Sequence, residues 1–177
     1  MSGLTLARRA ARVRLLVLDV DGVLTDGRVV WDEGGRETKF FDIRDGHGLK
    51  LLMRAGVEVA WLSGRASRAN QVRARELGVT ELREGAKVKL PVLQELLERF
   101  QVAPEQVAYM GDDLIDLPPM RAVGLALAPA DAVAEVRAAA HWVSRFPGGR
   151  GAVREACELI LKSSGAWEQV TARYFRD

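Results

Sequence analysis

The chain has a single cysteine, Cys157, among its 177 residues. A lone cysteine cannot form a disulfide within one chain, so a small fold held together by disulfides is excluded. Cys157 follows Val153 and Ala156 and precedes Ile160, at the spacing of one helix face. We therefore expect its side chain to be a small buried hydrophobic group and not a nucleophile.

Long hydrophobic runs and a strong excess of one charge are also missing. No unbroken apolar stretch reaches the roughly 20 residues of a membrane helix, and the arginines of residues 1–14 precede no long apolar core. The net charge is only +2 and the arginines are scattered, which gives no argument for nucleic acid. We expect a cytoplasmic globular protein that binds neither membrane nor nucleic acid.

Strand-like and helix-like segments alternate along the chain, without repeats or low-complexity linkers. Apolar runs predict strands near residues 15–19, 57–62, 107–110 and 123–127, with a weaker one at 80–82. Helical spacing predicts helices near residues 46–55, 66–77, 89–100, 131–138 and 151–163. This alternation favours right-handed βαβ units. We predict one α/β domain over residues 1–177, a Rossmann-like three-layer fold with a central parallel sheet. The tail at 164–177 is either an extra helix packed on a neighbour or a frayed end.

The apolar run at residues 15–18 stops at Asp19 and Asp21, which are followed at once by Gly22. Ligands of open α/β sheets bind beyond the carboxyl ends of the strands. In an extended backbone the two aspartates point the same way, and the glycine lets backbone N–H groups approach an anion. The pair can act as nucleophile and metal ligand, or it can form an Asx turn that ends the strand.

A second acidic cluster follows the strand expected at 107–110 and contains Asp112, Asp113 and Asp116. Three carboxylates within five residues suit a hard, oxygen-preferring divalent cation. The alternative is that Asp112 or Asp113 caps a helix.

Groups suited to a phosphate lie at two further positions. Ser63 follows the strand at 57–62, where its hydroxyl can donate to a phosphate oxygen or form a plain turn. Lys87 and Lys89 open the helix expected at 89–100, where an ammonium group can face a phosphoryl oxygen or remain solvated.

In order and chemistry these motifs resemble those of the haloacid dehalogenase-like phosphohydrolases, over nearly the whole chain. The matching residues are Asp19, Asp21, Ser63, Lys89 and Asp112. The resemblance implies that Asp19 attacks phosphorus to give an aspartyl-phosphate. Asp21 protonates the leaving sugar oxygen and later takes a proton from water. Asp19, Asp112 and the backbone carbonyl of Asp21 hold Mg²⁺.

The remaining roles follow from the same resemblance. Ser63 and Lys89 bind the other phosphoryl oxygens, with Lys87 as a competitor for the lysine role. Asp113 and Asp116 orient Lys89 or a metal-bound water.

Between Thr25 and Arg44 there is room only for a hairpin at about residues 27–42, and not for a cap domain. Its arms are expected at 28–31 and 38–41, around a turn at 32–35. Together, the stretches at residues 19–27, 44–48, 111–116 and 148–155 look like those of the 3-deoxy-D-manno-octulosonate 8-phosphate phosphatases. These enzymes supply the lipopolysaccharide sugar of Gram-negative outer membranes. The resemblance implies a homotetramer with a central barrel of hairpins, in which neighbouring chains cover one another's sites. The hairpin is also too apolar for an isolated ribbon in water.

Substrate choice depends on three arginines. Arg65 and Arg73 can bind a sugar carboxylate in bidentate fashion, or they can be ordinary helix-surface charges. Family members that act on the eight-carbon ester carry arginine at the position of Arg65, where relatives acting on nine-carbon esters tend to carry glutamate. Arg150 lies in the segment 148–155, which either reaches a neighbouring site or is a flexible lead into the last helix.

Two departures leave the substrate open. His47 stands where an aromatic residue is expected, and the pair Pro118 and Pro119 is unusual. One alternative is a phosphatase of the same fold for another sugar or nonulosonate phosphate. The other is a non-catalytic tetrameric scaffold, although a scaffold has no need of all five motif residues.

Overall fold

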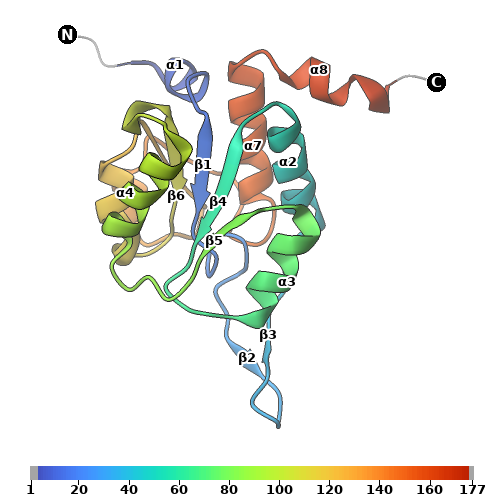
Figure 1. Cartoon of the computed structure of the whole chain (residues 1–177), viewed down its shortest axis with the longest axis vertical. Coiled ribbons are helices and arrows are strands. Elements are labelled where there is room, and N and C mark those ends of the chain that lie inside the picture. Colours follow the sequence, from blue (N-terminus) through green and yellow to red (C-terminus); the bar gives the residue numbers. More distant parts are fainter. Residues whose placement is uncertain (1–3, 176–177) are drawn as a thin grey trace.

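The computed structural model describes residues 4–175, and a six-stranded parallel sheet forms its middle layer (Figure 1). The strands lie in the order β5-β4-β1-β6-β7-β8. Their bounds are β1 Leu15–Leu18, β4 Glu58–Leu62, β5 Glu81–Arg83, β6 Val107–Met110, β7 Leu125–Ala128 and β8 Trp142–Val143. Leu18 of β1 lies opposite Trp61 of β4 and Met110 of β6. These three strands therefore end near one another at one edge of the sheet.

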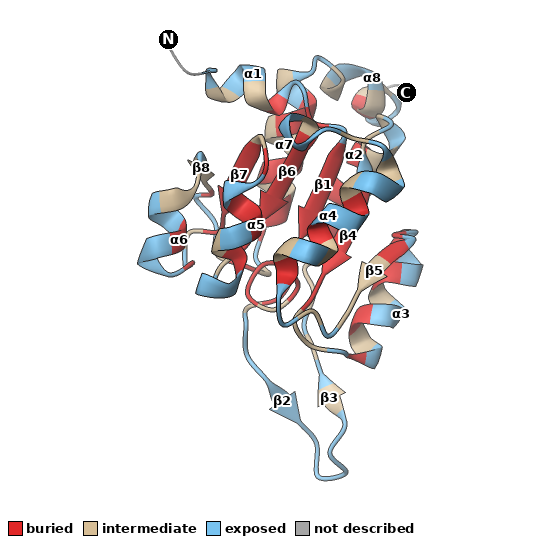
Figure 2. Ribbon diagram, turned by 60° about the vertical axis from the view of Figure 1, so that its left-hand side comes forward, coloured by how far each residue is buried: buried red, intermediate tan, exposed pale blue. Residues whose placement is uncertain are grey.

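Helices cover both faces of the sheet, which confirms the predicted three-layer α/β fold (Figure 2). One face packs against α1 Leu6–Ala10, α2 Ile43–Arg54, α3 Arg68–Leu77 and α7 Ala152–Ser163. The other face packs against α4 Lys89–Phe100, α5 Leu117–Arg121 and α6 Ala134–Ala139. Leu16 and Leu18 join the first core, and Leu15 and Val17 join the second. The continuous apolar run of β1 is explained because successive side chains enter opposite cores.

Several boundaries differ from the sequence-based expectation. Helix α2 begins at Ile43 instead of near residue 46, because the Asp42 carboxylate accepts hydrogen bonds from the backbone N–H groups of Arg44 and Asp45. Helices α1 and α5 and strand β8 were not predicted, and each is at most five residues long. Pro118 and Pro119 fit α5 because they lie in its first turn, where backbone N–H groups have no helical partner. The short 3-10 turns are η1 Pro104–Gln106, η2 Leu114–Asp116 and η3 Ala172–Tyr174.

The predicted hairpin is present and projects away from the sheet and helices (Figures 1 and 2). Its paired strands, β2 Val30–Trp31 and β3 Glu37–Thr38, are shorter than the predicted arms. Beyond Thr38 the chain returns to the body, where Phe41 stacks on Trp61 with 6.2 Å between the ring centroids. The second arm therefore ends sooner than the apolar residues at 40–41 suggest. Trp31 and Phe40 are 57% and 63% exposed.

The tail forms an additional helix, α8 Trp167–Thr171, followed by η3. Val170 and Trp167 pack against the core cluster beside α2 and α7. The Tyr174 hydroxyl lies 3.0 Å from His47 Nε2 and accepts a hydrogen bond from Arg54. Of the two alternatives for the tail, the structure shows the extra helix. This helix packs against its own chain. Residues 176–177 of the expected tail lie outside the described residues.

Two findings concern what the sequence lacks. Cys157 is fully buried in α7, as expected, and burial raises the pKa of its thiol far above the usual range. Among the residues that the structure describes, no helix combines the length and apolar character needed to cross a membrane.

Candidate active site

Asp19 begins a tight loop directly after β1. Its backbone N–H donates to the Met110 carbonyl at 3.0 Å, so the pairing with β6 continues to the strand end. The chain then turns back, because the N–H groups of Leu24 and Thr25 both donate to the Val20 carbonyl. This turn leaves the carboxylate of Asp19 at the edge where β1 and β6 end.

Gly22 lets this loop lie against the second acidic motif. Its φ is +93°, in the region that favours glycine, and an added Cβ would overlap the carboxylate of Asp112. The glycine after the first acid pair is therefore required both by its backbone conformation and by the close approach of Asp112.

A cavity of about 340 Å³ opens at this edge of the sheet. It is lined by the loop after β1, the turn after β4, the first residue of α4 and the loop after β6. The lining residues are Asp19, Asp21, Gly27, Gly64, Arg65, Lys89, Asp112, Asp113 and Ile115. The structure thus brings four of the five motif residues to one cavity, and the fifth, Ser63, lies directly beside it.

Lys89 is the buried cation of the cluster. Its Nζ lies 2.8 Å from Asp19 Oδ1 and 2.7 Å from Asp116 Oδ1, and its side chain is almost fully buried. Burial acts to lower the pKa of Lys89, but the two carboxylates outweigh it and the net pKa is raised. Lys87, the competing lysine, is exposed. Lys89 therefore stays an ammonium that faces Asp19 and Asp116.

Asp116 holds Lys89 in place. Its Oδ1 accepts hydrogen bonds from Lys89 Nζ and from the Tyr109 hydroxyl, both at 2.7 Å. Its Oδ2 accepts from the backbone N–H groups of Asp112 and Asp113, at 3.1 and 3.3 Å. Both oxygens are thereby engaged, so Asp116 orients its neighbours and has little capacity left for another ligand.

Asp113 and Tyr109 lie beside the cluster. Asp113 was expected to orient Lys89 or a metal-bound water, with helix capping as the alternative. It is exposed, and its carboxylate accepts the N–H of Leu114 and caps η2, as in the alternative. Tyr109 was not singled out, although a tyrosine inside a fully buried strand needs a partner for its hydroxyl. That partner is Asp116.

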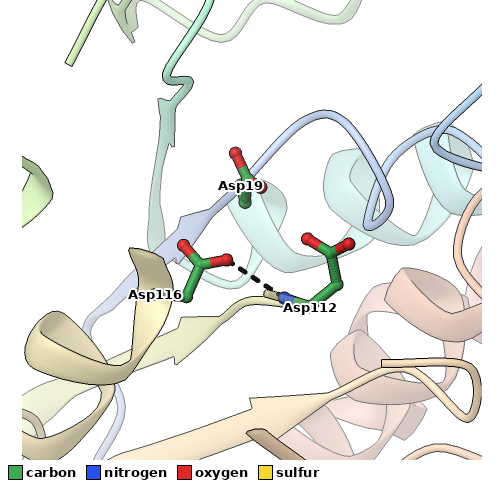
Figure 3. Close-up of side chains that lie close together, drawn as sticks. All are labelled: Asp19, Asp112 and Asp116. Carbon is green, nitrogen blue, oxygen red and sulfur yellow. Dashed lines mark hydrogen bonds between the residues drawn. The ribbon is translucent and has the colours of Figure 1, made fainter. Parts of the chain in front are cut away.

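Asp19, Asp112 and Asp116 converge from the ends of β1 and β6 (Figure 3). One carboxylate oxygen from each lies within 4.8 Å of the others. Burial, followed by the charges of Asp19 and Asp116, raises the pKa of Asp112 to about 8. Burial likewise raises the pKa of Asp19 to about 6, against the opposing effect of Lys89. Two buried carboxyl groups and the half-buried one of Asp112 face one ammonium, so ionisation of all three would leave excess negative charge at this point.

These residues fit a divalent cation. Asp112 Oδ1 is buried and has no hydrogen-bond partner among the described residues, and a buried carboxylate oxygen left so is costly unless a cation binds it. Asp19 would contribute its second oxygen, since its contact with Lys89 is at Oδ1. Carboxylate oxygens are the ligands that hard divalent cations prefer.

Ser63 and Arg65 form the turn after β4. The Ser63 hydroxyl donates to the Arg65 carbonyl at 2.8 Å and accepts from the Arg65 N–H at 3.2 Å. Arg65 lines the cavity, and its guanidinium donates to Glu37 of the hairpin at 2.7 Å. These are the hydrogen bonds of a plain turn. For Ser63 to donate to a phosphate oxygen, that oxygen would have to replace the Arg65 carbonyl as acceptor.

Arg73 and Arg150 do not line this cavity. Arg73 forms an ion pair with Glu76 at 2.9 Å and lines a separate cavity of about 610 Å³ between the hairpin and α3. Arg150 is exposed, with its guanidinium 3.9 Å from Asp26. The glycine segment before it supports its own chain, because the Gly149 N–H donates to the Val23 carbonyl at 2.9 Å.

Lys39 is a further cation at the site, and no pattern in the sequence singled it out. Its Nζ lies 2.6 Å from Asp21 Oδ1 and 4.0 Å from Glu37 Oε2, and the side chain is 2% exposed. Position 39 follows a short strand of the hairpin, where a lysine is ordinarily solvated. Only the return of the hairpin to the body places its ammonium beside Asp21.

The three-layer fold and the acidic residues at the ends of β1 and β6 define a haloacid dehalogenase-like hydrolase, and residues 45–124 match the family model of that description. The 3-deoxy-D-manno-octulosonate 8-phosphate phosphatase KdsC of Yersinia pestis is 48% identical over 164 residues, which cover 93% of this chain and 88% of the relative. The chain belongs to the 3-deoxy-D-manno-octulosonate 8-phosphate phosphatase family.

Solved structures agree in fold over nearly the full length. The phosphatase of that name from Moraxella catarrhalis, in complex with a magnesium ion, a phosphate ion and a KDO molecule, is 36% identical with a TM-score of 0.93; the alignment covers 96% of this chain and 97% of that one. The cobalt-bound enzyme of Haemophilus influenzae is 39% identical with a TM-score of 0.89, over 94% of this chain and 98% of that one.

Proposed function

We propose that this chain hydrolyses 3-deoxy-D-manno-octulosonate 8-phosphate to the free sugar acid and inorganic phosphate. The observation that carries the proposal is the cavity at the ends of β1 and β6, where Asp19, Asp21, Lys89 and Asp112 meet. Relatives that are about half identical in sequence are named as phosphatases of this ester.

Asp19, Asp112 and the backbone carbonyl of Asp21 would hold a divalent cation, which we propose to be Mg²⁺. When bound, it supplies positive charge that offsets the repulsion between a carboxylate and a phosphate dianion. Support comes from the unpartnered oxygen of Asp112 and from the magnesium in the Moraxella catarrhalis structure. Cobalt in the Haemophilus influenzae structure makes it the natural competitor in a metal-exchange experiment.

The chain's own groups carry out the two steps. An Asp19 oxygen attacks phosphorus and forms an aspartyl-phosphate, while the bond from phosphorus to the sugar oxygen breaks. Asp21 gives a proton to the departing sugar oxygen and then removes one from the water that hydrolyses the aspartyl-phosphate. Lys89, fixed by Asp116, and Ser63 bind the remaining phosphoryl oxygens.

Arg65 is proposed to bind the carboxylate of the sugar acid, because it lines the cavity together with Asp19, Asp21 and Lys89. The substrate carboxylate would replace Glu37, which occupies the guanidinium here. Arg73 and Arg150 lie outside the cavity of their own chain, so a substrate contact from either requires a neighbouring chain.

We also propose a cytoplasmic homotetramer built from one domain per chain. The support is the hairpin, which exposes Val29, Trp31 and Phe40, because a two-stranded ribbon with exposed large apolar side chains is marginal in water. Four hairpins packed together would bury these side chains and place a neighbour beside each cavity.

A panel of phosphate esters assayed with Mg²⁺ tests the function. We expect the octulosonate 8-phosphate to exceed arabinose 5-phosphate in kcat/KM by about 100-fold or more, because arabinose 5-phosphate has no carboxylate for the Arg65 guanidinium. A nonulosonate 9-phosphate keeps a carboxylate but has a longer carbon chain, and it should be hydrolysed less well than the octulosonate ester. If the octulosonate ester is hydrolysed no better than the others, the proposed substrate is wrong. A chain inactive toward every ester would instead favour the scaffold alternative.

A further inference from the structure

Lys39 is a buried ammonium at the junction of the hairpin and the cavity. Its side chain is 2% exposed, and its Nζ donates to Asp21 Oδ1 at 2.6 Å. A buried ammonium is stable only when it is paired and hydrogen-bonded. The contact with Asp21 is therefore a fixed feature of the fold and differs from the mobile ion pairs of a surface.

Further charges hold Lys39 from the other side. Glu37 Oε2 lies 4.0 Å from Lys39 Nζ, and Glu37 Oε1 accepts from Arg65 at 2.7 Å. Arg65, Glu37, Lys39 and Asp21 thus form a row of alternating charge that runs from the turn after β4 through the base of the hairpin. The ammonium cannot move away from Asp21 without also disturbing this row.

The pairing distinguishes the two oxygens of Asp21. Oδ1 is occupied by Lys39, and within residues 4–175 no side chain or backbone group hydrogen-bonds to Oδ2. The side chain of Asp21 is 23% exposed and lines the cavity. Oδ2 is therefore the oxygen available to a substrate, with the carboxyl plane fixed by the other oxygen.

We infer that Lys39 is a positioning residue for proton transfer by Asp21, an inference that rests on the proposed function. As the phosphorus–oxygen bond breaks, its electron pair stays on the sugar oxygen, and the proton on Asp21 Oδ2 moves to that oxygen. Asp21 is left as a carboxylate beside the Lys39 ammonium. The hairpin therefore contributes to the chemistry of its own chain, in addition to any contact with a neighbour.

Two leaving groups test this role. A sugar alkoxide needs a proton as it departs, whereas p-nitrophenolate departs without one. We expect Lys39→Met to lower kcat/KM for the octulosonate ester about tenfold or more beyond its effect on p-nitrophenyl phosphate. The parameter kcat/KM is chosen because it reports on the steps up to departure of the leaving group. It does not depend on the later hydrolysis of the aspartyl-phosphate.

Matched variants separate positioning from structural support. Arg36→Met removes another cation of the same hairpin, one that pairs with the exposed Asp32, and it should leave the ratio of the two kcat/KM values unchanged. In an Asp21→Asn background, Lys39→Met should no longer change that ratio, because no proton remains to be positioned. Lys39→Arg should restore part of the ratio.

Contrary outcomes are distinct. An equal loss for both esters would mean that Lys39 supports folding or phosphate binding only, and a gain with the sugar ester would mean that it opposes proton transfer; either overturns the inference. Failure of the unmodified chain to hydrolyse any ester would overturn the proposed function itself.

Discussion

The edge of the sheet and the hairpin differ in whether their side chains find partners within the chain. At the sheet edge, Asp116 engages both carboxylate oxygens inside the chain, and Lys89 is held between two acids. On the hairpin, Trp31 and Phe40 are mostly exposed, and the two strands share only two residue pairs. The single chain thus completes its charged cluster by itself, whereas the large apolar side chains of the hairpin stay exposed. The row of charges through Lys39 joins the two regions.

Removing the proposed nucleophile, Asp19, is expected to give the largest effect. Asp19→Asn should reduce phosphate release by about 10⁴-fold or more, because the amide cannot form the aspartyl-phosphate. The fold should persist, since Asp116 still pairs with Lys89. Phosphate release and the melting temperature measured on the same preparation check both parts. Substantial activity in this variant would remove Asp19 from the proposed mechanism.

Removing Asp116 should next weaken the charged cluster itself. Asp116→Ala leaves the Tyr109 hydroxyl and two backbone N–H groups without their acceptor and takes one carboxylate from buried Lys89. We expect a loss of about 3–5 kcal/mol in the free energy of unfolding. Urea unfolding followed by circular dichroism measures it.

Asp113→Ala is the matched control for that measurement. Asp113 is the exposed acid of the same motif and only caps η2, so its loss should cost about 1 kcal/mol. Similar losses for the two variants would contradict the structural difference between these acids.

The hairpin should show the smallest change in the stability of the single chain. Trp31→Ser alters an exposed side chain, so the free energy of unfolding of the isolated chain should change by less than about 0.5 kcal/mol. Assembly should weaken, because the surface that neighbouring hairpins would bury becomes polar. Sedimentation measures the oligomer, with Val72→Ser on α3 as an exposed apolar control. An unchanged oligomer would exclude Trp31 from the interface.

The charged cluster was more predictable from sequence than the contacts that hold it. Asp19 and Asp112 stand out because each interrupts a buried apolar run at a strand end, and parallel pairing then brings those ends together. Lys89 could be selected over Lys87 only through the family resemblance. The partners of Asp116 could not be read from the chain, because Tyr109 reaches it across the end of β6 and Lys89 comes from another element.

Other residues needed the three-dimensional arrangement. Arg73 was selected with Arg65 as a carboxylate ligand. Its ion pair with Glu76 is a local i,i+3 contact within α3, but its position over Phe41 depends on how α3 packs against the hairpin. Lys39 illustrates the same limit, because its neighbour Asp21 is set by how the hairpin returns to the sheet. The length of the hairpin strands was overestimated, because the chain leaves the strand pairing after Thr38 and Phe41 packs on Trp61 of the body.

The contact between Gly22 and Asp112 has a consequence for how this protein can change. Any side chain at position 22 would take the space of the Asp112 carboxylate, so a substitution there acts on the acid of another strand as well as on its own loop. Two motifs far apart in the sequence are therefore a single unit under mutation, and a library that varied one while holding the other fixed would return mostly inactive chains.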